Sequence, residues 1–228
     1  MKPPLIAMDG PAGAGKSTTS REVARRLGLP YLDTGALYRA AAWYFTQHGI
    51  NLKQPAAIQK HIEKCRMQFY AGEAGTHVWI NGDEITSHLR SQELTMKVGP
   101  VCELPEVRKW LVDLQRRWAS RGFGVMEGRD IGTVVLPKAE LKIYLTAKPE
   151  IRAVRRARQL GIADDKATVE KLAGEITERD KRDAEREIAP MRPAKDAVEL
   201  DTSTLSFEEQ VARVIGIVGD KFGLKIYG

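Results

Sequence analysis

The eight residues Gly10–Ser17, which read GPAGAGKS, constrain the fold of this chain more than any other stretch. They fit the phosphate-binding pattern G-x-x-x-x-G-K-S/T. The apolar run Leu5–Met8 before them predicts a buried strand, and Thr18–Leu27 after them predicts a helix. In such a strand–loop–helix unit, backbone N–H groups and the helix N-terminus surround a phosphate. The sequence therefore predicts a site for a nucleoside triphosphate.

Two side chains of the loop have specific expected roles. We expect the Lys16 ammonium to reach the β- and γ-phosphates and the Ser17 hydroxyl to bind Mg²⁺. A glycine-rich turn without a ligand is the alternative, which the flanking strand and helix disfavour. The residues expected to bind ATP are Gly10, Pro11, Ala12, Gly13, Ala14, Gly15, Lys16, Ser17 and Thr18.

Composition narrows the class of protein. The 228 residues suffice for one large domain, and 43% hydrophobic with 29% charged residues is ordinary for a globular protein. The net charge of +6 suits anionic partners, namely nucleic acid, a membrane surface or phosphorylated small molecules. Cys65 and Cys102 match no zinc spacing and fit a reducing compartment. No apolar stretch approaches the roughly 20 residues of a membrane span. We therefore expect a cytoplasmic protein.

Strands and helices are expected to alternate after the first helix, which should end near Gly28. Thr34 is a candidate cap for a helix that starts near Ala36. Residues 65–85 are expected to form a small antiparallel insertion with an Asn81-Gly82 turn, in which His77 and Trp79 pack rather than bind a ligand. The other expected helices are 54–64, 91–120 with breaks near Gly99-Pro100 and Pro105, 148–160, 176–187 and 207–222, and the other strands are 31–32, 122–126, 141–145 and 197–200.

An acidic and basic segment, Glu127-Gly128-Arg129-Asp130, follows the strand predicted at 122–126. Side chains at the carboxyl end of a parallel strand point into the ligand crevice of an α/β sheet. Glu127 is therefore a candidate to hold Mg²⁺ through water. Arg129 and Asp130 could instead form an ion pair with a purely structural role.

Arginines concentrate on two predicted helices. Arg152, Arg155 and Arg156 are spaced to share one cationic helix face, and Arg179, Arg182 and Arg186 lie at i, i+3 and i+7 with Asp183 alongside. One interpretation is a solvated helix with alternating charges, which the pairs Glu178/Arg182 and Asp183/Arg179 support. The other is a mobile lid, formed by both helices and the linker 161–166, whose arginines bind phosphate.

Such residues suit phosphoryl transfer to an acceptor that is itself a phosphate. Phosphoryl transfer depends mainly on positioning and charge stabilisation. A phosphate oxygen attacks without losing a proton, so no dedicated base is needed. The task is then to neutralise two anionic substrates, which arginines can do.

The chain resembles the bacterial cytidylate kinase family, whose members phosphorylate CMP and dCMP. The resemblance rests on six motifs that span nearly the whole chain in order. They are DGPAGAGKST (Asp9–Thr18), LDTGALYR (Leu32–Arg39), LPEVR (Leu104–Arg108), EGRDIGTVV (Glu127–Val135), ERDKRDAER (Glu178–Arg186) and LDTS (Leu200–Ser203).

The resemblance implies an α/β fold with a five-stranded parallel sheet, a small antiparallel β insertion in a nucleoside-monophosphate-binding arm, and a short helical lid. The core would comprise about 1–34, 121–150 and 190–228, the arm about 35–120 and the lid about 151–189. The implied enzyme is a monomer that uses ATP with Mg²⁺ and has CMP or dCMP as its other substrate. Nucleic-acid and membrane partners are not expected.

The resemblance also implies roles for individual residues. Thr34, Tyr38 and Arg39 would line the CMP site, and Arg39, Arg129 and Arg186 would hold the CMP phosphate. Arg108 and Asp130 would read the cytosine edge, and Arg179 and Asp183 would hold the sugar. Arg155 and Arg156 would close over the ATP phosphates from the lid. The implied catalytic residues are Lys16, Arg129, Arg155 and Arg156.

Three positions depart from the family pattern. Thr34 stands where Ser is frequent, and Glu127 stands where Asp is frequent. Gly99 replaces a Ser that helps some members to read the base. Discrimination of CMP from UMP therefore falls to Arg108, Asp130 and water.

Other classes of protein remain as alternatives. Another small P-loop kinase would share the loop, but the EGRD and ERDKRD segments disfavour it. A switch GTPase would need a guanine-reading N-K-x-D segment, which the sequence lacks. A nucleic-acid-binding module would show a basic stripe with interleaved aromatics, whereas the arginines gather in kinase motifs.

Overall fold

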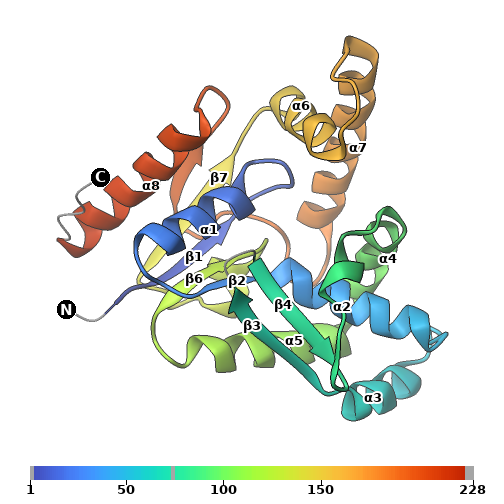
Figure 1. Cartoon of the computed structure of the whole chain (residues 1–228). Helices are drawn as coiled ribbons and strands as arrows, with labels where there is room; N and C mark the ends of the chain where they lie inside the picture. The colour runs from blue at the N-terminus through green and yellow to red at the C-terminus, as the bar shows by residue number, and fades with distance from the viewer. Residues whose placement is uncertain (1–2, 73–74, 224–228) are drawn as a thin grey trace. The chain divides into compact units, whose positions relative to one another are not determined.

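A computed structural model describes residues 3–72 and 75–223 (Figure 1). It contains a five-stranded sheet of order β2-β6-β1-β7-β8 and a three-stranded sheet of order β3-β4-β5. The predicted α/β fold, with a five-stranded parallel sheet and a small antiparallel one, is therefore confirmed. The chain divides into two compact units, Met1–Leu29 with Phe123–Gly228, and Pro30–Gly122.

The helices and strands alternate along the chain. Their bounds are β1 Leu5–Asp9, α1 Lys16–Arg26, β2 Tyr31–Asp33, α2 Thr34–Gln47, α3 Pro55–Lys64, β3 Met67–Gly72, β4 Gly75–Ile80, β5 Asp83–Glu84, the short 3₁₀ helix η1 Thr86–Arg90, α4 Gln92–Cys102, α5 Pro105–Ala119, β6 Gly124–Glu127, the π-helical turn η2 Ile131–Val135, β7 Leu141–Thr146, α6 Pro149–Leu160, α7 Lys166–Glu185, β8 Val198–Asp201 and α8 Phe207–Phe222.

Strand β1 lies at the centre of the first unit. It pairs in parallel with β6, where Met8 is opposite Glu127, and with β7, where Asp9 is opposite Tyr144. Its residues from Ile6 onward are buried, as expected for a strand covered on both faces of a parallel sheet. The carboxyl ends of β1 and β6 thus meet at one edge, and the segments that follow them start side by side.

Helices complete the first unit. Helices α1 and α8 pack against each other, and α6 and α7 form a helical hairpin (Figure 1). Helix α8 has the predicted bounds, and Ser206 and Glu209 form a reciprocal capping box at its start. Its buried residues Val211, Val214 and Val218 recur at helical spacing.

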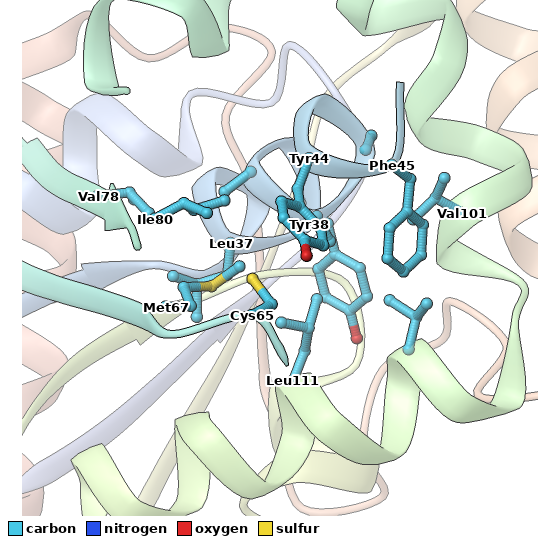
Figure 2. Close-up of a cluster of buried hydrophobic side chains, with 14 of the residues drawn as sticks. Leu37, Tyr38, Tyr44, Phe45, Cys65, Met67, Val78, Ile80, Val101 and Leu111 are labelled. Atoms are coloured by element: carbon cyan, nitrogen blue, oxygen red, sulfur yellow. The ribbon is translucent and has the colours of Figure 1, made fainter. Parts of the chain in front are cut away.

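The second unit has its own hydrophobic core. Figure 2 shows side chains of α2, among them Leu37 and Phe45, gathered with residues of β3, β4, α4 and α5. The antiparallel sheet packs one face onto this core through Val78 and Ile80, which are buried. The unit is therefore a helical layer with a small sheet laid against α2.

The predicted antiparallel insertion is confirmed. Strand β3 pairs with β4, and β4 pairs with β5 across Asn81 and Gly82, whose φ angles are 55° and 100°. Positive φ at both central residues is the signature of the hairpin turn that Asn-Gly favours. His77 and Trp79 stack on each other at 6.1 Å between ring centroids, and His77 also hydrogen-bonds Glu84 at 2.9 Å.

Three local predictions are wrong. The cap of α2 is Asp33, whose carboxylate accepts from the Ala36 N–H, and Thr34 is instead the first helical residue. Helix α4 continues through Gly99 and Pro100, because Pro100 falls in its last turn. A proline there removes only one hydrogen bond near an end that frays anyway. Helix α7 starts at Lys166, ten residues before the prediction, and ends at Glu185, so that Arg186 is its C-cap.

We predict that Asp196→Asn lowers the melting temperature by a few degrees. The Lys142 ammonium is buried in β7 and donates to both carboxylate oxygens of Asp196, at 2.8 and 2.9 Å. The Asn variant leaves that buried cation without its counter-charge. The exposed Asp113→Asn serves as control, and thermal denaturation is the measurement. The ion pair also holds the pKa of Asp196 below its usual range. The difference from wild type should therefore persist at neutral pH and vanish as pH falls through that lowered pKa.

Candidate active site

The glycine-rich loop between β1 and α1 leaves no room for a side chain at Gly10 or at Gly15. Gly10 has φ 140°, and a Cβ there would lie 2.0 Å from the Leu145 carbonyl oxygen. Gly15, the N-cap of α1, has φ 88°, and a Cβ would lie 2.5 Å from Gln210 Oε1. The predicted strand–loop–helix unit is confirmed, with the helix starting at Lys16, two residues earlier than predicted.

Lys16 and Ser17 are the first two residues of that helix. Lys16 is 7% exposed, and its ammonium donates to the Pro11 carbonyl oxygen at 3.0 Å, across the loop. Ser17 is exposed. An accessible hydroxyl fits Mg²⁺, which takes oxygen ligands and keeps several waters beside substrate phosphates. Within residues 3–72 and 75–223, no group of three or more His, Cys, Asp or Glu residues could hold a metal by itself.

The segment after β6 is bonded to the loop. Glu127 ends the strand and is 2% exposed. The Arg129 guanidinium donates from Nη1 to the Gly10 carbonyl oxygen at 2.8 Å. This contact places a candidate phosphate-binding arginine against the start of the phosphate-binding loop.

Two ion pairs connect the same segment to the end of α7. Arg129 Nε donates to Asp183 Oδ2 at 3.3 Å, and Arg186 Nη2 lies 3.8 Å from Asp130 Oδ1. These four predicted site residues are therefore together. The predicted pair Glu178/Arg182 is present at 3.5 Å, and Asp183 pairs with Arg129. Arg179 lies exposed on α7, one turn before Asp183.

The three arginines of the predicted cationic face all lie on α6, and each has different hydrogen-bond partners. Arg152 is buried and donates to the Ala147 and Ala12 carbonyl oxygens and to Asp180. Arg155 donates to the hydroxyl and carbonyl oxygens of Thr202, at 3.0 and 2.6 Å. Arg156 donates to the Gln159 side chain at 2.9 Å. Helical spacing places the three on one side of the helix, but Arg152 and Arg155 bond to segments far apart in the sequence, whereas Arg156 bonds within α6.

The second unit holds the remaining predicted site residues. Arg39, on α2, donates to Asp33 Oδ2 at 2.7 Å. Arg108, on α5, is 4% exposed, donates to the Cys102 carbonyl oxygen at 3.3 Å and lies 5.7 Å above the centre of the Tyr38 ring. Thr34 is buried at the start of α2. Arg108 and Tyr38 are thus brought together by α5 and α2.

Two residues that hold the loop were not among the predicted site residues. Asp9 is buried and accepts hydrogen bonds from the N–H groups of Ile131 and Gly132. Burial raises its pKa to about 6, against the lowering effect of these two bonds. The Thr202 hydroxyl lies 3.0 Å from the Ala14 carbonyl oxygen of the loop. The signal for Asp9 was a charged residue that closes an apolar strand directly before the loop.

Comparison with known proteins gives consistent matches. Residues 6–220 match the family model described as cytidylate kinase. The chain is 44% identical to a cytidylate kinase of Carboxydothermus hydrogenoformans over 95% of this chain and 97% of that one. It is 48% identical to a cytidylate kinase of an Exiguobacterium species, over 92% of this chain and 93% of that one.

Similarity to a solved structure supports the fold and says nothing about function. A crystal structure of a Thermus thermophilus protein superimposes with a TM-score of 0.50 at 19% identity, over 97% of this chain and 99% of that one. Among the described residues, no helix has the length and apolarity needed to cross a membrane.

Proposed function

The chain belongs to the cytidylate kinase family, and from that premise we propose how its residues move the γ-phosphoryl group of ATP onto CMP or dCMP. The products are ADP and CDP or dCDP. The enzyme is a phosphotransferase of nucleotide metabolism whose acceptor is already a phosphate. Its own residues must therefore bind, orient and neutralise two anionic nucleotides.

The loop binds the donor. Backbone N–H groups of Gly10–Ser17 and the N-terminus of α1 surround the ATP phosphates, and Lys16 exchanges its bond to Pro11 for the β- and γ-phosphates. Mg²⁺, when bound, neutralises charge on those phosphates. The Ser17 hydroxyl would hold it directly and Glu127 through water. Thr18 is the last of the residues assigned to ATP binding, and its hydroxyl donates to the Gly15 carbonyl oxygen at 2.9 Å.

The acceptor phosphate is assigned to arginines. Arg129 and Arg186 lie in the first unit, each beside a carboxylate that a phosphate can replace as the counter-anion. Arg39 is assigned the same role. During transfer, the bond from the γ-phosphorus to the acceptor oxygen forms as its bond to the leaving ADP oxygen breaks. Arg129 and Lys16 stabilise the negative charge on the transferring group and the leaving oxygen, and no general base is required.

The base and sugar are assigned to polar side chains. Arg108, stacked on Tyr38, offers donors to cytosine, and Asp130 accepts from its amino group. Thr34 supplies a further hydroxyl, while Arg179 and Asp183 are assigned to the sugar. Arg155 and Arg156 are assigned to closure over the ATP phosphates. Arg155 is already bonded to Thr202, whose hydroxyl contacts the loop.

The observation that carries the assignment is the Arg129–Gly10 hydrogen bond, in a chain that matches the family over residues 6–220. It joins the arginine assigned to the acceptor phosphate to the first residue of the donor loop. The two phosphates can then be held close enough for in-line transfer.

A coupled assay of ADP formation with CMP, dCMP, UMP and AMP tests the proposal. We expect CMP and dCMP to be the best acceptors by kcat/KM and AMP to be poor. AMP as the best acceptor would assign the chain to a different nucleotide. Activity that survives removal of Mg²⁺ by chelation would contradict the role given to Ser17.

A further inference from the structure

Asp9 is a carboxylate buried at the end of the central strand, directly before the phosphate-binding loop. It is 5% exposed. Its Oδ1 accepts from the Ile131 N–H at 2.8 Å, and its Oδ2 accepts from the Gly132 N–H at 2.7 Å. Both oxygens therefore accept hydrogen bonds from the first two residues of the π-helical turn η2, which lie 122 and 123 residues further along the chain.

A carboxylate in this place is costly. Removing an ionised group from water is unfavourable unless it is well paired, and burial is the largest influence on the Asp9 pKa. A neutral side chain would avoid that cost. The two backbone N–H groups bond to two separate oxygens, however, and Asp is the smallest residue whose side chain has two acceptor oxygens.

Other bonds join the same two segments. The Gly128 N–H donates to the Met8 carbonyl oxygen at 3.0 Å, and Arg129 Nη1 donates to the Gly10 carbonyl oxygen at 2.8 Å. Met8, Asp9 and Gly10 thus hold the chain on both sides of Arg129 and Asp130. Asp9 fixes the distal side, since its partners directly follow Asp130.

We propose that Asp9 is a positioning residue for phosphoryl transfer, which fixes the turn carrying Arg129 and Asp130 against the start of the phosphate-binding loop. The inference rests on the proposed roles of Arg129 and Lys16. Asp9 itself touches neither nucleotide in this scheme. It acts by holding the turn that carries Arg129 and Asp130 in a fixed position relative to the phosphate-binding loop.

The test variant is Asp9→Asn, which keeps the shape and removes one acceptor. The amide NH₂ group would face a backbone N–H, leaving one of the two donors unpaired. We expect kcat to fall and the KM for CMP to rise, with a loss of up to about 100-fold in kcat/KM, as small displacements of catalytic groups can cause. The KM for ATP should change less, because the loop keeps its own contacts. The exposed Asp220→Asn is the matched control.

A double-mutant cycle with Arg129→Met separates positioning from a purely structural role. If Asp9 acts through the Arg129 turn, the two losses in kcat/KM are non-additive. If the losses add, or if folded Asp9→Asn keeps the wild-type kcat and KM for CMP, the inference is overturned. Kinetic constants are expressed per folded molecule, with folding measured by circular dichroism.

Gly132→Ala probes the same contact from the other side and covers the case in which Asp9→Asn does not fold. A Cβ on Gly132 would lie 3.1 Å from the Lys142 side chain and 3.4 Å from Asp9 Oδ2. It should displace the Gly132 N–H and lower kcat/KM for CMP in the same direction, and wild-type kinetics would overturn the inference. The wild-type enzyme is measured first, so that failure of the proposed function can be told from failure of the Asp9 inference. A wild-type enzyme that is inactive toward CMP would refute the proposed function and would leave the Asp9 contact untouched.

Discussion

Replacing Lys16 with Met is expected to lower kcat by about 10²- to 10³-fold, the loss typical for one preorganised stabilising donor. The Met side chain keeps most of the apolar stem in a residue that is 7% exposed, so packing is largely preserved. The substitution removes the ammonium, which would stabilise the negative charge of the phosphoryl group during its transfer from ATP to CMP. Because this contact is strongest in the transition state, kcat should fall more than the KM for ATP rises.

The measurement is steady-state kinetics with CMP and ATP, accompanied by thermal denaturation. Lys166→Met is the matched control, because Lys166 is an exposed lysine at the start of α7. An unchanged kcat in folded Lys16→Met would remove Lys16 from the catalytic residues. A raised KM for ATP with unchanged kcat would restrict it to ground-state binding.

The sequence predicted the elements well where a local signal and the tertiary environment agree. Asn81-Gly82 specifies its turn by backbone preference alone, and Ser206 with Glu209 specifies the start of α8. Pro100 shows the opposite case. Proline was treated as a helix breaker, but its cost in a last turn is small compared with the packing of Val98 and Val101, which are buried in the core of the second unit.

The candidate site was predictable in its residue types and less so in its contacts. Spacing alone put Arg152 and Arg155 on one helix face, and nothing in that spacing says that Arg152 is buried against Ala12 while Arg155 reaches Thr202. Partners far apart in sequence are set by strand order. Arg129 meets Gly10 because β6 lies beside β1, a neighbour relation that no local pattern encodes.

Asp9 was overlooked for the same reason. Its two donors, Ile131 and Gly132, reach it through the β1–β6 pairing. From the sequence it is one acidic residue beside a glycine-rich motif. Only the fold shows that both its oxygens are occupied by the segment following Asp130.

Arg108→Met is expected to lower kcat/KM for CMP by roughly 10- to 100-fold, the equivalent of one lost charge-assisted hydrogen bond of about 1.5–3 kcal/mol. The guanidinium has donors only. Cytosine presents acceptors at N3 and O2, whereas uracil carries a hydrogen on N3, so a donor at this place favours CMP. UMP should therefore lose less than CMP, and the ratio of their kcat/KM values should narrow.

Gly99 makes this expectation sharper, because it brings no side chain that could read the base in place of Arg108. The Arg108 guanidinium is also held by the Tyr38 ring and the Cys102 carbonyl oxygen, so thermal denaturation must show that the variant is folded. Arg108→Lys keeps the charge without the planar fork and should recover only part of the CMP preference. Arg117→Met, exposed on the same helix, is the control. Equal losses for CMP and UMP would mean that Arg108 supports the fold of the second unit without reading the base, and discrimination would then rest on Asp130.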